Sequence, residues 1–424
     1  MIGEIMKTKL SLAALVAGGM MVATSGSASA ADLGGDCCAD LEERVATLEA
    51  TTARKGNRKV SLKISGWVNK ALMIWDDGTD SDAYNVDSTF ASTRIRFTGG
   101  AKINHEWSAG YRIEIETLTD RTFSVSQASD DNANSLRIRD SNMYIKSKSL
   151  GKLTWGFGSS PTDNLTFSSN VAGFSSITSG AQADFLGNSS FTVNGTPLFR
   201  ITGGLQSGSF FESSFLTNII RYDSPTIGGF TISASWGEDD FYDVAIKTTQ
   251  KFGDFTFKAS AGYRVFEGDD PRKGFAGSDR GITKEENLLA NFGLMHNPTG
   301  LFIHGQYSGF EYDSFVAANA PDSADDTYGW HLQGGIKQRW NSLGKTTLWG
   351  GYTEINNGYA TAALASIAAG TTTEANKVQL GAIQEIDAAA MHLYITYEHQ
   401  EFEISGQAAI DDIDLVLIGG VIKF

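Results

Sequence analysis

The sequence has no long apolar run, and this absence excludes a helical membrane protein. A transmembrane helix needs about 20 predominantly apolar residues, whereas the apolar stretch from 10 to 22 is shorter and lies near the start of the chain. Proline is also scarce, with 6 residues in 424, and no shift in composition marks a domain boundary. The chain is too long for one ordinary all-β sandwich, so we expect one large domain.

Basic residues are fewer than acidic ones, and histidine is rare. The formal net charge of −15 argues against nucleic acid as a partner. The acidic residues gather in predicted loops, where they are either solvated or bridged by divalent cations to lipopolysaccharide phosphates. No spacing indicates a dedicated metal site or a cofactor. No nucleophile motif accompanies the histidines, so an enzyme barrel is a remote alternative. The histidines are His105, His296, His304, His331, His392 and His399.

Residues 1–30 read as a secretory signal peptide. Lys7 and Lys9 form a basic start, residues 10–22 an apolar stretch, and Ala28-Ser29-Ala30 a small-residue cleavage site. An apolar stretch of about thirteen residues cannot cross a bilayer as a helix. The pattern predicts an exported protein whose mature chain begins near Ala31.

The two cysteines, Cys37 and Cys38, are adjacent and follow the signal directly. A disulfide that closes a ring between neighbouring residues is strained, so pairing between chains is chemically easier. Free thiols are the alternative. Asp36 stands where a lipoprotein cleavage box needs a small residue.

Residues 31–59 predict a short periplasmic coiled-coil helix followed by a basic linker. Cys38, Leu41, Val45, Leu48 and Thr52 recur at three- and four-residue spacing, which makes roughly two heptads. Such a helix is too short to be stable alone. It becomes stable if a trimeric barrel holds three copies together, with Cys37 or Cys38 locking the stalk. An amphipathic or disordered lead segment is the alternative.

From residue 60 onward, apolar and polar residues alternate in about sixteen short segments, which is the pattern of β-strands. In 230–236, Phe230, Ile232, Ala234 and Trp236 alternate with smaller polar residues. Lysine and arginine on the polar phase of other segments would be costly against lipid, so that phase must line water. The predicted strands are 60–75, 89–103, 106–118, 135–148, 152–158, 217–224, 229–237, 242–252, 254–266, 286–296, 300–311, 328–340, 345–356, 376–387, 391–403 and 413–424.

Short turns alternate with long, acidic connections, and aromatic residues recur near strand ends. Outer-membrane barrels have short periplasmic turns, long external loops and aromatic girdles at both interfaces. A soluble sandwich has no reason to sort its loops in this way. We therefore expect an all-β transmembrane barrel of about 16 antiparallel strands over 60–424, wide enough to leave an aqueous channel.

The segment 159–216 is roughly sixty residues long, far longer than a hairpin loop. It contains few charges but many large apolar groups, which a loop displayed in water would not need. We expect it to fold inward as the third loop and narrow the channel, with Asp163 and Asp184 facing the permeant stream and Glu212 a further candidate. An external lid or a subunit-contact loop is the alternative. The phenylalanines are Phe167, Phe174, Phe185, Phe191, Phe199, Phe210, Phe211 and Phe215.

Arginines on early strands are candidates for the opposite wall of this constriction. Basic residues that face acids across a narrow pore create a transverse field that orders water and biases ions. The alternative is that the arginines only pair with glutamates along the wall. A change of phase after Asp140 suggests a β-bulge. The candidates on these strands are Arg94, Arg96, Arg112, Glu114, Glu116, Arg137 and Arg139.

Several stretches resemble the trimeric outer-membrane porins of alphaproteobacteria, of rhizobial type. They are "VSLKISGWVNKAL" at 60–72, "LGKLTWGFGSS" at 150–160, "NIIRYDSPTIGGF" at 218–230 and the closing "LVLIGGVIKF". The resemblance implies a 16-stranded barrel with an inward third loop, a homotrimer in outer-membrane lipid and lipopolysaccharide, and recognition of Phe424 by the barrel assembly machinery.

The implied function is passive diffusion of ions and small hydrophilic solutes. A substrate-selective channel with a phenylalanine-rich lining is the alternative, and the ion preference stays open.

Overall fold

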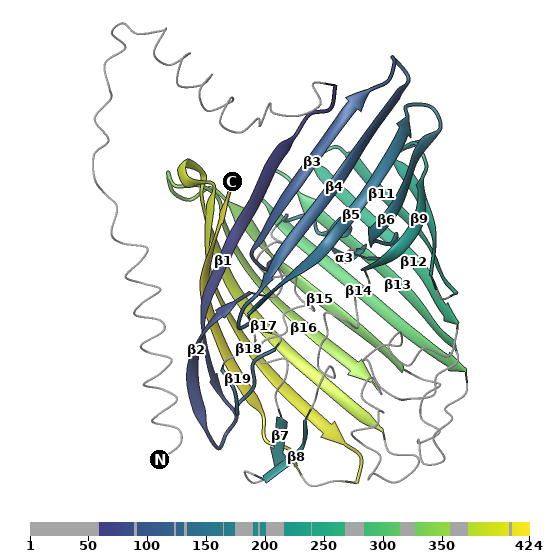
Figure 1. Ribbon diagram of the computed structural model, residues 1–424. Helices are drawn as coiled ribbons and strands as arrows, with labels where there is room; N and C mark the ends of the chain where they lie inside the picture. The colour runs from purple at the N-terminus through teal and green to yellow at the C-terminus, as the bar shows by residue number, and fades with distance from the viewer. Residues whose placement is uncertain are drawn as a thin grey trace, which may run out of the picture. The chain divides into compact units, whose positions relative to one another are not determined.

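Figure 1 shows the computed structural model, in which the strands run side by side around a barrel. The predicted signal peptide, Cys37, Cys38 and the heptads lie outside the described residues. No helix among the described residues has the length and apolarity to cross a membrane. The structure describes residues 59–88, 91–122, 124–130, 134–163, 165–173, 190–193, 196–200, 216–238, 240–267, 284–313, 327–356, 372–406 and 409–424.

The sheet closes on itself because the first and last strands pair. β1 (Lys63–Asp76) is antiparallel to β19 (Ile413–Lys423). β2 (Ser81–Asp87) and β3 (Arg94–Lys102) both pair with β1, so they share one position in the wall. The result is a closed antiparallel barrel of 16 strands, as predicted. The other barrel strands are β4 Trp107–Leu118, β5 Ser135–Ser147, β6 Gly151–Ser159, β9 Leu216–Asp223, β10 Phe230–Gly237, β11 Phe241–Phe252, β12 Phe255–Glu267, β13 Lys284–His296, β14 Leu301–Asp313, β15 Thr327–Gln338, β16 Thr346–Asn356, β17 Thr373–Ile386 and β18 Met391–Ile404.

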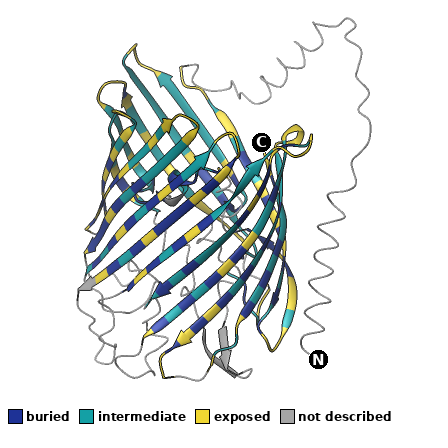
Figure 2. Ribbon diagram, turned by 180° about the vertical axis from the view of Figure 1, so that it is seen from behind, coloured by how far each residue is buried: buried dark blue, intermediate teal, exposed yellow. Residues whose placement is uncertain are grey.

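The side-chain phases are inverted relative to a soluble protein. On β10, Ile232 and Trp236 are 53% and 57% exposed, whereas Ser233 and Ser235 are buried. Figure 2 shows the resulting stripes of exposed and buried residues along the strands. Apolar side chains on the outer surface and polar ones inside suit a wall between hydrocarbon and water. The predicted direction of the polar phase is confirmed on this strand.

One sector of the inner wall is apolar, which the alternation did not predict. Met73 and Trp75 of β1, Tyr84 of β2 and Leu415 and Leu417 of β19 lie on the inward phase and are buried in one hydrophobic cluster. The outward phase of β19 is also rich in valine and isoleucine. Both phases of this strand are therefore apolar. The expectation that the inward phase lines water is wrong for this sector.

The predicted strand 89–103 is also wrong in part, because the strand within it, β3, covers only Arg94–Lys102. Residues assigned to an acidic loop form β2, and β3 begins only at Arg94. The carboxylate of Asp87 accepts a hydrogen bond from the main-chain N–H of Thr93 (3.1 Å), which holds the break between the two strands. β2 carries just two large apolar side chains, Tyr84 and Val86, too short an alternation to stand out in the sequence.

Short turns gather at one end of the barrel. Asn104 closes the β3–β4 turn, where its side-chain oxygen accepts hydrogen bonds from the main-chain N–H groups of Glu106 and Trp107 (both 2.8 Å). At the β11–β12 turn Gly253 has φ +53, a conformation that L side chains rarely adopt. The β17–β18 turn contains the 3-10 helix η5 (Asp387–Ala389). The predicted sorting of short turns to one end is confirmed for these connections.

The segment 159–216 contains regular elements that the sequence did not predict. The short helix α3 (Leu165–Ser169) lies near its start, and β7 (Ser190–Val193) and β8 (Thr196–Arg200) form a small hairpin. The remaining residues of this segment beyond 173 lie outside the described part of the chain.

Candidate functional site

A cluster of arginines lies on the inward phase of β3 and β4, where Glu114 is its centre. Strand pairing places Arg96 opposite Glu114 and Arg94 opposite Glu116. The guanidinium groups of Arg94, Arg96 and Arg112 each contact the Glu114 carboxylate, at 2.9, 2.5 and 2.6 Å. The Glu114 side chain is only 1% exposed, so this carboxylate is buried among cations. Charged groups that leave water need such compensation.

Glu116 is the centre of the second half of the cluster, which β5 completes. Its carboxylate contacts Arg139 at 2.9 Å and also pairs with Arg137. Ser92 donates a hydrogen bond to the same carboxylate (2.9 Å). Strands β4 and β5 slip in register here, because Ile115 faces Ile138 while Glu114 faces Asp140. Arg139 is the extra residue of this β-bulge, which confirms the predicted change of phase.

The sequence leaves two roles open for the arginines, a charged wall of the constriction or simple pairing with glutamates. In the structure they do pair with Glu114 and Glu116 along the wall. However, the side chains of Arg112 and Arg137 remain 41% and 44% exposed. The five arginines of the cluster also outnumber its three carboxylates, which are Glu114, Glu116 and Asp140. The wall therefore keeps a positive charge that reaches water.

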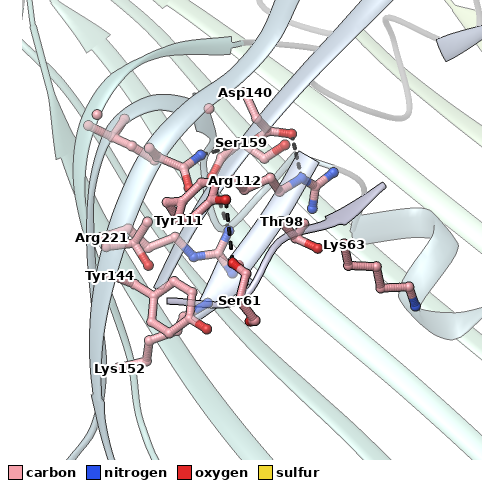
Figure 3. A pocket seen from close by; sticks show the side chains of 16 residues that line it. Ser61, Lys63, Thr98, Tyr111, Arg112, Asp140, Tyr144, Lys152, Ser159 and Arg221 are labelled. Carbon is pink, nitrogen blue, oxygen red and sulfur yellow. Dashed lines mark hydrogen bonds and ion pairs between the residues drawn. The ribbon is translucent and has the colours of Figure 1, made fainter. Parts of the chain in front are cut away.

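A pocket of about 590 Å³ continues this wall towards the short-turn end, between β1 and β9. Figure 3 shows its cationic side chains, among them Lys63, Arg112, Lys152 and Arg221. Arg112 contacts Asp140 at 2.8 Å, and Arg221 contacts Asp223 at 2.7 Å. Lys152 also contacts Asp223, at 3.1 Å.

The sequence reading missed Lys63, Lys152 and Arg221, because only strand pairing shows that they face the same way as the arginine cluster. It also missed Trp67. The guanidinium carbons of Arg94 and Arg96 lie 4.8 and 5.3 Å from the centroid of the Trp67 ring, which holds them by cation–π contact.

Across the lumen, residues 160–173 lie against the inward side chains of β11 to β15. The hydroxyl and main-chain N–H of Thr162 donate to Asp243 on β11 (2.7 and 2.8 Å). Ser260 on β12 donates to the carbonyl of Leu165 (3.1 Å). Ser169 contacts His304 on β14 (3.1 Å). The ammonium groups of two lysines then donate to main-chain carbonyls, Lys258 to that of Asn170 (3.1 Å) and Lys337 to that of Ala172 (2.8 Å).

A glycine on the wall makes this close approach possible. A Cβ atom at Gly293 would collide with the main-chain carbonyl oxygen of Ser169. The inward phase of β13 thus leaves space for the backbone of the segment, which no larger residue at this position would allow.

Asp163 is placed differently from expectation. It is only 4% exposed, whereas the sequence reading had it facing the permeant stream. Burial raises the pKa of this carboxyl to about 6, although hydrogen bonding by Ser159 and the charge of Arg139 oppose the shift. The other predicted acids of the segment, Asp184 and Glu212, lie outside the described residues.

At the seam of the barrel, Phe424 exchanges main-chain hydrogen bonds with Gly66, at 2.9 and 3.1 Å. The residue is 60% exposed. The last residue therefore extends the β19 pairing and leaves its aromatic ring on the surface.

A comparison with protein families identifies the family of this chain. The model of the Gram-negative porin family matches residues 12–407. This chain belongs to the Gram-negative porin family. The porin is an outer-membrane channel for passive diffusion, and membership of this family points to a channel and not to an enzyme.

Solved structures share the fold of this porin at low sequence identity. An anion-selective porin from Comamonas acidovorans is 14% identical, with a TM-score of 0.55, over 86% of this chain and 100% of that one. OmpF of Salmonella typhi, in complex with daunomycin, is 13% identical, with a TM-score of 0.52, over 87% and 99%. The trimer form of OmpT from Vibrio cholerae is 15% identical, with a TM-score of 0.53, over 86% and 99%. A search of curated proteins finds no match.

Proposed function

We propose that this porin favours small hydrophilic anions among the solutes that diffuse through it. The observation that carries the proposal is the excess of cationic over anionic side chains on the inward phase of β1, β3 to β6 and β9. Fixed charges that line a pore attract counter-ions and repel ions of their own sign. The cations are Lys63, Arg94, Arg96, Arg112, Arg137, Arg139, Lys152 and Arg221, and the carboxylates are Glu114, Glu116, Asp140 and Asp223.

The acidic external loops pull in the opposite direction. Their carboxylates concentrate cations at the mouth of the channel, but salt screens this effect over about 10 Å at 0.1 M and about 3 Å at 1 M. An ion that passes the arginine cluster is in direct contact with Arg112 and Arg137, so screening weakens the wall less than the loops. The anion preference should therefore persist at high salt.

The reversal potential in a salt gradient tests the proposal. Purified porin is placed in a planar bilayer that separates 0.1 M from 1 M KCl. The sign of its reversal potential should indicate a preference for chloride over potassium. The double variant Arg112→Gln, Arg137→Gln should shift the reversal potential towards the value for a potassium-selective channel, because it removes the two most exposed cations of the cluster. Lys345→Gln, in the short β15–β16 turn, is the control and should leave it unchanged. Potassium preference of the wild-type porin, or no shift in the double variant, would overturn the proposal.

The segment 159–216 is the second wall of the proposed constriction. Support comes from the bonds of residues 160–173 to the inward side chains of β11 to β15, and from the many phenylalanines of a segment that carries few charges. In this proposal Asp184 and Glu212 face the arginine cluster across the channel. An external lid or a subunit-contact loop is the competing arrangement.

We further infer a homotrimer. The resemblance to alphaproteobacterial porins and the trimer form of the similar OmpT structure support it. In this assembly residues 31–59 form a periplasmic stalk through Leu41, Val45 and Leu48, with Cys37 and Cys38 close enough to pair between chains. Export through the signal peptide at 1–30, contact with lipopolysaccharide and recognition of Phe424 by the assembly machinery complete the proposal.

A substrate-selective channel is the second candidate. The many phenylalanines of the segment 159–216 favour it, because an apolar lining would bind the apolar surface of a solute. Conductance that saturates with one sugar or amino acid would support this candidate over general diffusion.

A further inference from the structure

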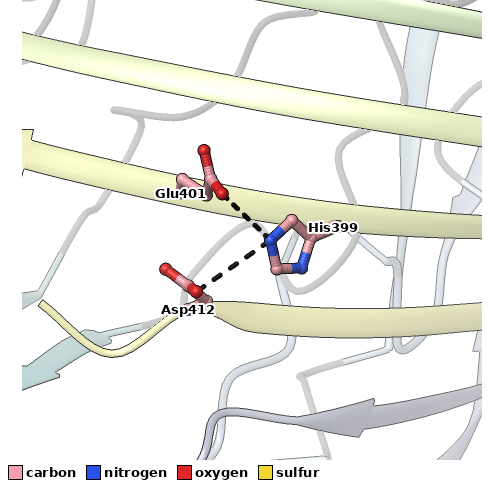
Figure 4. Close-up of side chains that lie close together, drawn as sticks. All are labelled: His399, Glu401 and Asp412. Atoms are coloured by element: carbon pink, nitrogen blue, oxygen red, sulfur yellow. Dashed lines mark hydrogen bonds and ion pairs between the residues drawn. The ribbon is translucent and has the colours of Figure 1, made fainter.

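At the end of the barrel opposite the short turns, three side chains of types that can bind metal ions meet outside the lumen. His399 and Glu401 lie on the phase of β18 opposite to its buried residues Glu398, Gln400 and Phe402. Asp412 lies just before β19, which pairs with β18. Figure 4 shows both carboxylates directed at the same ring nitrogen of His399. The arginine cluster and the pocket of the channel do not include these residues.

The distances fit a small cation. The Nε2 atom of His399 lies 3.3 Å from Glu401 Oε1 and 3.9 Å from Asp412 Oδ2. All three atoms are within 4.8 Å of one another. Ligand atoms around a tetrahedral Zn²⁺ ion, at bond lengths of about 2.0 to 2.1 Å, lie about 3.3 Å apart. Small side-chain rotations would bring these three atoms to that separation and leave a fourth position for water.

The other nitrogen of the imidazole is already held. His399 Nδ1 lies 2.9 Å from Asp414 Oδ1, which also accepts a hydrogen bond from the hydroxyl of Tyr397 (2.5 Å). A proton on Nδ1 leaves the lone pair of Nε2 directed at Glu401 and Asp412. Carboxylates that orient the distal nitrogen of a ligating histidine are the usual support of metal sites.

A lone pair that faces two carboxylates needs a positive charge between them. Among the described residues, every ion pair of Glu401, Asp412 and Asp414 involves His399, and no lysine or arginine joins them. We propose that His399, Glu401 and Asp412 bind one divalent transition-metal ion, Zn²⁺ or one of similar preference. Imidazole with carboxylate ligands suits such ions, whereas Ca²⁺ and Mg²⁺ prefer all-oxygen sites.

A bound ion would join the end of β18 to the segment that leads into β19. Because the ion binds the folded barrel and not the unfolded chain, it should stabilise this corner of the molecule by mass action. The rival arrangement has no ion. In it, a protonated His399 supplies the positive charge, and the four side chains form an ordinary surface ion-pair cluster.

Zinc titration separates the two arrangements. The experiment uses the untagged mature porin in detergent, with Cys37→Ser and Cys38→Ser to remove competing thiols. Calorimetry should show one Zn²⁺ per chain. His399→Ala should weaken binding at least tenfold, and Asp414→Asn about 10-fold to 100-fold through loss of the imidazole orientation. Glu403→Gln is the matched control, because Glu403 shares the strand face but not the cluster; it should bind as the parent does.

Cobalt supplies the second readout, since four-coordinate Co²⁺ absorbs visible light far more strongly than the hydrated ion. The parent porin should give this spectrum and His399→Ala should not. Heat-modifiable electrophoretic mobility and channel conductance of the same preparations show that each variant is folded and open. Absence of stoichiometric Zn²⁺ binding, or equal binding by His399→Ala, would overturn the proposal. Displacement of bound Zn²⁺ by an equal concentration of Ca²⁺ would also overturn it. The carboxylates would then attract hard cations without selecting a transition metal.

Discussion

Buried carboxylates determine how many arginines the inner wall can hold. Glu116 is fully buried and pairs with Arg137 and Arg139, while Arg94 and Arg121 lie 3.9 Å from its oxygens. One buried negative charge thus compensates several guanidinium groups. Its removal would leave cations that are shielded from water and lack a counter-charge, which is costly inside a protein.

Glu116→Gln should therefore destabilise the barrel by about 3 to 5 kcal/mol in denaturant unfolding. Asp387→Asn is the contrasting change, because the Arg339–Asp387 pair is about half exposed and surface pairs contribute about 0 to 1 kcal/mol. Equal losses in the two variants would show that the arginine cluster does not depend on Glu116.

The contribution of Asp163 to folding stability depends on pH with a sign opposite to that of most carboxylates. Its folded pKa of about 6 lies above the ordinary value of 3.8. The folded state therefore binds the proton more tightly than the unfolded state does. The contribution of Asp163 to stability is then most favourable below about pH 4 and falls as the pH rises through 6.

Asp163→Asn should raise unfolding stability by roughly 3 kcal/mol at pH 7.5 and change it little at pH 4. Thermal loss of heat-modifiable mobility at the two pH values measures the difference. A large shift in reversal potential without the gain in stability would instead place the carboxylate on the permeant path.

Strand irregularities decide which side chains enter the lumen. Without the bulge at Arg139, Asp140 and Asn142 would point to lipid whenever Arg137 pointed inward, because strand side chains alternate. Ser92, in the break between β2 and β3, donates a hydrogen bond to the buried Glu116 carboxylate.

The seat of α3 on the wall depends on Gly293. In Gly293→Val the branched side chain would fill the space of the Ser169 carbonyl and push residues 165–173 towards the channel axis. Single-channel conductance should fall. Gly334→Val on β15 is the control, because a Cβ there meets its nearest atom, the Phe302 carbonyl oxygen, at 3.4 Å, an ordinary contact. Unchanged conductance in Gly293→Val would separate this segment from the permeant path.

At the scale of the whole molecule, stability has two sources. The main-chain pairing of β1 with β19 leaves the barrel sheet, within the described residues, without a free edge, which removes the usual site of strand addition and aggregation. Lipid then surrounds the exposed apolar phase, where charged side chains would be costly. The trimer that we propose would add a third source, through the stalk at residues 31–59.

Deletion of residues 32–58 should weaken the trimer without changing the conductance of each channel. Detergent electrophoresis without heating measures the assembly. In the full chain under non-reducing conditions, Cys37 and Cys38 should give covalent dimers or trimers that reductant removes. A deletion variant whose trimer resists heat as well as the full chain would contradict the stalk.

The porin fold was predictable because its signal is periodic and local. Alternation such as that of 230–236 depends only on one strand lying between lipid and water, so each segment could be read alone. The inward direction of Arg94, Arg96, Arg112, Glu114 and Glu116 followed for the same reason. Asp163 was misplaced because burial depends on the distant strands that surround it, and Lys152 and Arg221 were missed because they are separated along the sequence.

By itself, the sequence determined the class of structure, the closed barrel and the phase of most strands, because two-residue periodicity and turn residues act over short distances. Only the tertiary structure decided which side chains meet. The convergence of several arginines on Glu114 and the approach of Asp412 to His399 both depend on strand register. Register is a cooperative property of neighbouring strands, and no single segment encodes it.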